Sequence, residues 1–134
     1  MRRFLTWAFF AYFAVLTVGL VTPDPMGVAR GRQSWLHDWY LAYLEPIGHL
    51  LGFTALGFLG AASRWPWSGT TRLIVLAFYA VGTEAWQMLV PPRTPEWKDV
   101  VQNLAGIGIG ALLWWGVVRW RQRSAAQESV EACS

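Results

Sequence analysis

The sequence predicts an all-α membrane protein in which four transmembrane helices form an antiparallel bundle. The chain of 134 residues is 54% hydrophobic and only 14% charged, whereas a soluble domain carries roughly 25% charged residues. Its uncharged runs are each close to the length that crosses a hydrocarbon core of roughly 30 Å as a helix. The length suits one domain, and a net charge of +3 gives no indication of nucleic-acid binding.

Four apolar segments define the predicted helices. The first, over about residues 4–22, is too long for the apolar region of a secretory signal peptide, so we expect an uncleaved anchor. The other helices are expected over about residues 46–63, 72–90 and 99–118. We therefore predict one domain over residues 1–118, followed over 119–134 by a basic and then polar tail that is disordered.

A short helix is also expected in the first loop, residues 23–45. Ser34 can cap it, because its hydroxyl can accept from free backbone N–H groups. Aromatic and apolar side chains then recur at helical spacing, at Trp35, Leu36, Trp39, Tyr40, Tyr43 and Leu44. Such a helix suits the membrane interface. An ordinary loop helix packed on the bundle is the alternative.

The basic residues predict the orientation. Four spans place both termini on one side, and most basic residues lie on that side: Arg2, Arg3, Arg64, Arg72, Arg119, Arg121 and Arg123. The other side carries fewer, namely Arg30, Arg32, Arg93 and Lys98. The positive-inside rule therefore predicts that both termini are cytoplasmic. The single cysteine, Cys133, would then lie free in a reducing compartment.

Polar residues gather at the outer ends of three predicted helices. Some share a helix face at spacings of three or four residues, and Glu84 lies about 9 Å inside the expected end of its helix at Val90. The set comprises Glu45 and His49, Glu84 and Gln87, Arg93 in a short loop, and Asp99 and Asn103. Such groups are costly at membrane depth, so their convergence indicates a pocket for a polar or charged group.

Each of these residues also has a purely structural interpretation. Glu84 or His49 could join helices by hydrogen bonds, as Asn103 could. Asp99 could be an N-cap at the positive end of a helix dipole, and Arg93 could neutralise one carboxylate. Two glycine pairs with small-xxx-small spacing predict close helix packing, namely Gly48 with Gly52 and Gly106 with Gly110.

One stretch resembles the signature of the VanZ-like membrane proteins. It reads Glu84-x-x-Gln87, then Pro91-Pro92-Arg93, then Asp99-x-x-x-Asn103-x-x-Gly106-x-x-x-Gly110. A second family motif, an acidic residue shortly before a histidine, is similar to Glu45-Pro46-Ile47-Gly48-His49, with Pro46 where members often have Lys. The resemblance covers roughly residues 4–118. It implies a small four-helix envelope protein, and the family's namesake is associated with bacterial resistance to teicoplanin.

We expect a binding protein whose pocket faces outward and takes a lipid headgroup, a lipid-linked cell-wall precursor or a glycopeptide. Glu84 and His49 would form its floor, with Glu45 at its rim. Gln87 and Asn103 would form its walls. Arg93, oriented by Asp99, would meet a phosphate or carboxylate with its fork of donors. The expected partners are membrane lipids or a lipid-linked envelope precursor, with no cofactor and no nucleic acid.

Three alternatives remain open. An intramembrane enzyme acting on a lipid-linked substrate would use Glu84 as base and His49 as its acid partner. A metal protein could take ligands for Zn²⁺ or Mn²⁺ from Glu45, His49, Glu84 and Asp99, with His49 and Glu84 as the first candidates. No compact motif such as His-Glu-x-x-His is present, so we expect no metal. A transporter is disfavoured, because acidic residues in both membrane halves or a broken helix would be expected.

Overall fold

The structure is a computed structural model that describes residues 2–22, 43, 45–63, 65–89 and 96–131. The described part contains helices and no strand, which confirms the all-α fold class. The helices are α1 (Arg2–Val21), α3 (Glu45–Ala62), α4 (Gly69–Gln87) and α5 (Trp97–Glu131). The helix expected in the first loop lies outside the described residues, except for Tyr43 and the start of α3.

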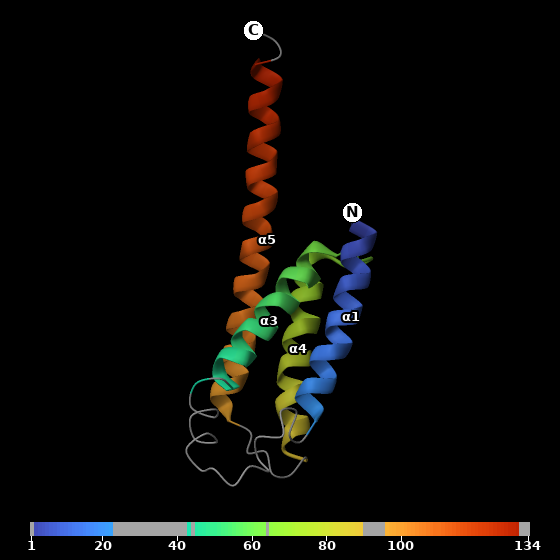
Figure 1. The fold of residues 1–134 in the computed structure, drawn as a ribbon, viewed down its shortest axis with the longest axis vertical. Coiled ribbons are helices and arrows are strands. Elements are labelled where there is room, and N and C mark those ends of the chain that lie inside the picture. Colours follow the sequence, from blue (N-terminus) through green and yellow to red (C-terminus); the bar gives the residue numbers. More distant parts are fainter. Residues whose placement is uncertain (1, 23–42, 44, 64, 90–95, 132–134) are drawn as a thin grey trace.

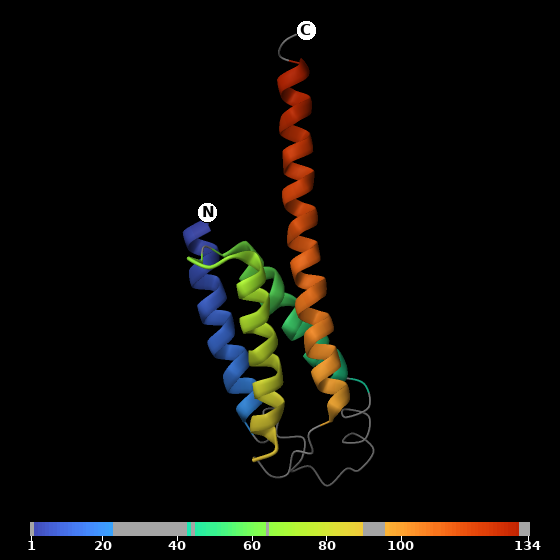
Figure 2. The ribbon, with the colours of Figure 1, turned by 180° about the vertical axis from the view of Figure 1, so that it is seen from behind.

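The helices run alternately up and down (Figure 1). The first residue of α1 and the last residues of α5 lie at one end, which we call the terminus end. The last residues of α1 and α4 and the first residues of α3 and α5 lie at the opposite end, which we call the loop end. In both views α1 and α4 lie side by side (Figures 1 and 2), and α3 contacts all three other helices, α5 most extensively. The arrangement therefore brings the predicted polar positions of α3, α4 and α5 to the loop end.

Two helices have the length and composition of membrane spans. They are α1, over Arg3–Val21, and α5, over Trp97–Glu128, while Pro46–Ala62 of α3 is a shorter apolar helix. Large apolar side chains such as Phe4, Trp7, Phe78 and Leu112 are mostly exposed. An apolar outer surface of this kind suits contact with lipid.

Two helices differ in their bounds from the prediction. The helix α4 is shifted toward its N-terminus, to Gly69–Gln87 instead of residues 72–90, and Ser68 caps its start by accepting from the Thr71 N–H at 3.1 Å. The helix α5 does not end near residue 118 but continues to Glu131, so residues 119–131 are helical where a disordered tail was expected. This segment contains neither Gly nor Pro and is rich in Arg, Gln, Ala and Glu, which favour helices.

The buried core is apolar and lies between all four helices. It consists of Phe9, Leu20, Phe53, Leu56, Leu76, Ala80 and Ile107. Aromatic rings extend it, with Phe13 and Tyr79 at a centroid distance of 4.6 Å. Their packing joins α1 to α4, while the polar residues of the candidate site lie beside this core at the loop end.

Glycines allow α3 and α5 to pack backbone against backbone. A Cβ atom added at Gly106 would lie 2.7 Å from the Leu50 carbonyl oxygen, and one at Gly110 would lie 2.5 Å from the Phe58 nitrogen. Both predicted packing roles are confirmed. From the other side, Gly57 packs on the backbone of Ile107.

The other predicted glycine pair does not bring two backbones together. An added Cβ at Gly48 would meet nothing within 4 Å among the described residues, and one at Gly52 would meet the Leu16 side chain at 3.2 Å. The close backbone contact that a glycine of α3 makes with α5 therefore lies further along α3, at Gly57. It fixes the register between α3 and α5, and so the relative positions of His49 and Asn103.

Candidate functional site

Three polar side chains from three helices meet at the loop end. His49 lies in the second turn of α3, Glu84 in the last turn of α4 and Asn103 in the second turn of α5. Their relative exposures are 6%, 3% and 0%, respectively. The convergence expected from helix depth thus occurs, and its members are almost completely buried.

Glu84 lies closer to the helix end than the sequence indicated. Because α4 ends at Gln87 and not at Val90, Glu84 is one turn from the end, or about 4.5 Å. Pro91 follows closely, and a residue before proline is disfavoured in the helical conformation. The site is therefore nearer to the loops than to the middle of the helices.

Asn103 links the other two residues by hydrogen bonds. Its Nδ2 donates to Glu84 Oε1 at 3.0 Å, and its Oδ1 lies 2.9 Å from His49 Nδ1. An ionised carboxylate and an amide oxygen can only accept. With Glu84 ionised, the amide must therefore donate to Glu84, and the His49 Nδ1 must carry the proton. This tautomer leaves the lone pair of the imidazole on Nε2.

A second carboxylate lies beside this network. Ligand atoms of His49, Glu84 and Asp99 all lie within 4.8 Å of one another, and the His49 Nδ1 to Glu84 Oε1 distance is 3.7 Å. Asp99 is partly buried and occupies the first turn of α5, where its N–H donates to the Glu96 carbonyl at 3.0 Å. It is the third residue of the helix, so it faces the positive end of the helix dipole without being the N-cap.

Gln87 connects α4 to α1. Its exposure is 3%, and its Nε2 donates to the Leu20 carbonyl oxygen at 3.3 Å. The sequence placed Gln87 on the same helix face as Glu84, and the structure shows that this face also reaches the end of α1. A fourth helix is thereby tied to the loop end.

Two predicted site residues are not placed. Glu45 begins α3, but its side chain is outside the described residues, as is the whole of Arg93. Their roles at the rim and over the pocket stay predictions. In the sequence, Glu45 precedes His49 by four residues and Arg93 follows Gln87 by six.

A family model described as VanZ/LLP1 matches residues 6–119. The chain belongs to the VanZ/LLP1 family. The match contains every residue of the candidate site, from Glu45 to Asn103. Together with the two helices long and apolar enough to cross a membrane, it makes the chain a membrane protein. Comparison with curated proteins and with solved structures gave no match.

This VanZ/LLP1 protein has further polar contacts that the sequence did not predict. The Tyr12 hydroxyl donates to the Gly52 carbonyl at 2.9 Å, and the hydroxyls of Thr17 and Tyr79 are 2.8 Å apart. Both pairs join helices within the span. The hydroxyl residues in these pairs are uncharged and belong to no motif. The sequence alone therefore does not distinguish them from the other hydroxyl residues of the chain.

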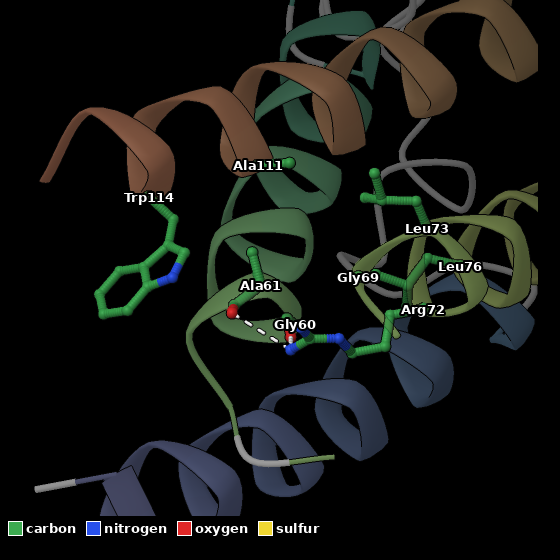
Figure 3. A pocket seen from close by; sticks show the side chains of 8 residues that line it. All are labelled: Gly60, Ala61, Gly69, Arg72, Leu73, Leu76, Ala111 and Trp114. Carbon is green, nitrogen blue, oxygen red and sulfur yellow. Dashed lines mark hydrogen bonds between the residues drawn. The ribbon is translucent and has the colours of Figure 1, made fainter. Parts of the chain in front are cut away.

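A cavity of about 190 Å³ lies at the terminus end, away from the polar site (Figure 3). Arg72 lines it and points to the end of α3, where its Nη1 donates to the carbonyls of Gly60, Ala61 and Ser63 at 3.1–3.3 Å. These bonds satisfy carbonyls that a helix C-terminus leaves free. Arg72, expected only to mark the cytoplasmic side, therefore also caps α3.

The chemistry of the loop-end site follows from its atoms. Its described members offer two carboxylates, an imidazole lone pair and an amide. These groups can accept protons or hydrogen bonds, or ligate a cation, and the burial of His49, Glu84 and Asn103 strengthens electrostatic interactions there.

Proposed function

We propose that this VanZ/LLP1 protein crosses the bacterial cytoplasmic membrane four times, with both termini in the cytoplasm. The two apolar helices and the position of the chain ends at one end of the molecule support this topology. The excess of basic residues at the terminus end supports the cytoplasmic assignment. The loop end then faces outward.

In this orientation, the loop-end site binds the polar headgroup of a lipid or a lipid-linked cell-wall precursor. The observation that carries the proposal is the buried hydrogen-bonded chain from His49 through Asn103 to Glu84. Burying such groups is costly, and well-packed apolar residues often give equal or greater stability. Three helices contributing to one such network favour a role in binding over a role in packing alone.

Arg93 supplies the recognition of negative charge in this proposal. It follows α4 by six residues, in the loop that leads to α5. Its guanidinium can bind a phosphate or carboxylate through two parallel hydrogen bonds. Binding of a lipid-linked precursor at this site would account for a role in glycopeptide resistance, as the family namesake has.

The experiment replaces Arg93 in cells that depend on this protein for growth with teicoplanin. Arg93→Ala is expected to lose the protection while the protein stays in the membrane fraction at the normal level. Lys98→Ala is the matched control, because Lys98 lies in the same region, is exposed and pairs only with the exposed Glu96 among the described residues, at 3.4 Å. Full protection by Arg93→Ala would contradict the proposal.

The 3.7 Å pair of His49 and Glu84 favours a second candidate, an intramembrane enzyme acting on a lipid-linked substrate. Glu84 would be the general base, and His49 its acid partner. Purified protein would then convert a labelled lipid-linked substrate, and Glu84→Gln would be inactive while Glu96→Gln stays active. Absence of turnover by the wild-type protein would leave the binding function as the better explanation.

A further inference from the structure

We infer that His49, Glu84 and Asp99 bind one divalent cation of the kind that accepts mixed nitrogen and oxygen ligands, such as Zn²⁺ or Mn²⁺. One potential ligand atom from each residue lies within 4.8 Å of the other two. The three residues come from α3, α4 and α5, so the fold itself assembles the set. The three residues are at least 15 positions apart in the sequence.

The spacing suits a single ion. Zinc binds imidazole nitrogen and carboxylate oxygen at about 2.0–2.2 Å in a tetrahedral arrangement, so two ligand atoms on one ion are about 3.4 Å apart. The ligand atoms lie within 4.8 Å of one another, so the most widely spaced pair would close by up to about 1.4 Å through side-chain rotation when one ion binds.

The charges suit a cation as well. Two carboxylates and a neutral imidazole sum to two negative charges when both acids are ionised, and a divalent cation neutralises them. A cation would add to the existing contacts of Glu84, which is almost fully buried and accepts from Asn103 Nδ2, because charge in such a place is costly unless it is hydrogen-bonded, paired or bound to a metal. One histidine among oxygen ligands favours Zn²⁺ or Mn²⁺ over Ca²⁺ and Mg²⁺, which prefer oxygen alone.

Asn103 has the position of a residue that orients a metal ligand. Metal-binding histidines usually donate their other ring N–H to a carbonyl or carboxylate. The Nδ1 of His49 lies 2.9 Å from Asn103 Oδ1 and 3.7 Å from Glu84 Oε1. Coordination through Nε2 would keep the hydrogen bond to Asn103, and it requires the carboxylates to turn from Nδ1 toward Nε2. Asn103 also donates to Glu84, so one amide would hold two ligands.

Three protein ligands leave one position of a four-coordinate ion open for a further oxygen. In the part of this inference that rests on the proposed function, that oxygen belongs to the phosphate of the headgroup. The cation gives a site with two carboxylates an affinity for an anion, alongside Arg93. Cation binding itself does not depend on this step.

The test is a Zn²⁺ titration of the full chain, purified in detergent, stripped with EDTA and measured against a chromophoric chelator. The wild-type protein is expected to bind one Zn²⁺ per chain. His49→Gln, Glu84→Gln and Asp99→Asn should each weaken binding at least tenfold, and Asn103→Leu by about 10–100-fold as for other residues that orient metal ligands. Glu96→Gln and His37→Gln are controls and should bind as the wild type does.

Binding of less than one Zn²⁺ per chain by the wild type, or unchanged binding in both Glu84→Gln and Asp99→Asn, would overturn the inference. Substitution of the wild-type site with Co²⁺ tests it without any variant. Visible absorption bands that saturate at one Co²⁺ per chain and disappear on adding Zn²⁺ support the site, and their absence refutes it.

The two proposals fail separately. Zinc binding together with full teicoplanin protection by Arg93→Ala would refute headgroup recognition and leave the cation site standing. Loss of protection in Arg93→Ala without stoichiometric zinc binding by the wild type would refute the cation site alone.

Discussion

Asn103 of α5 donates a hydrogen bond to the Glu84 carboxylate of α4 at 3.0 Å, and both side chains are buried. This contact joins helices that the sequence separates by a loop. Because Oδ1 of the same amide accepts from His49, the contact also sets which nitrogen of the imidazole carries the proton.

Replacing Asn103 with leucine is expected to destabilise the protein. The substitution leaves the Glu84 carboxylate and the His49 N–H without these partners, and a buried group that loses its hydrogen bond costs about 1–3 kcal/mol. Thermal unfolding in detergent measures the change. Gln102→Leu is the control, because Gln102 Oε1 is buried with no hydrogen-bond partner among the described residues. A smaller loss in Asn103→Leu than in Gln102→Leu would contradict this account.

Adding one methyl group at Gly110 is expected to force α3 and α5 apart. The new Cβ would meet backbone atoms of Thr54 and Phe58, which cannot rotate away, and overpacking typically costs about 1–3 kcal/mol. Gly108→Ala on the same helix would meet no described residue within 4 Å and should be neutral, or stabilising by up to about 1 kcal/mol through helix propensity. Equal melting temperatures for the two variants would show that the close approach is not required.

Removing the Arg72 guanidinium is expected to loosen the end of α3. Arg72→Leu loses hydrogen bonds from a charged donor to the carbonyls of Gly60, Ala61 and Ser63, with an expected loss of about 1–3 kcal/mol in the free energy of unfolding. Arg121→Leu, at an exposed position of α5, should change it by less than about 0.5 kcal/mol. Hydrogen exchange of the last turn of α3 would show whether the effect is local.

The proposed topology predicts the reactivity of engineered and native cysteines. Cys133 is the single cysteine of the chain, and it should resist a membrane-impermeant maleimide in intact spheroplasts but react after lysis. In a Cys133→Ser background, Glu96→Cys should react in intact spheroplasts, because Glu96 is exposed at the loop end. The opposite pattern would mean that the loop end faces the cytoplasm.

Helix positions and the convergence of His49, Glu84 and Asn103 could be predicted from the sequence. Uncharged runs fix where helices form, and counting turns from the loops fixes which polar residues share a depth. The same count placed Glu84 too deep, because the end of α4 depends on the local conformation before Pro91 and not on hydropathy. Helical periodicity does not show whether Asn103 forms hydrogen bonds with one neighbour or with two, because that depends on side-chain geometry.

Other features depend on contacts between distant residues. Gly57 looks no different in sequence from Gly48, yet only Gly57 packs against the backbone of α5. The capping of α3 by Arg72 depends on how the chain turns between α3 and α4. The sequence could therefore assign the arginine to a side of the membrane but could not identify its hydrogen-bond partners. Asp99, considered alone, suggested an N-cap, and only the start of α5 at Trp97 shows that it is not one.

The continuity of α5 has a mechanical consequence. Asn103 and Glu131 belong to one helix without an interruption, and the 28 residues between them span about 42 Å at 1.5 Å per residue. A tilt of α5 by about 5° around Asn103 moves the Glu131 end by about 4 Å. A small change in the tilt of α5 at the polar site would therefore produce a larger displacement at its C-terminal end, which extends beyond the other helices (Figure 1).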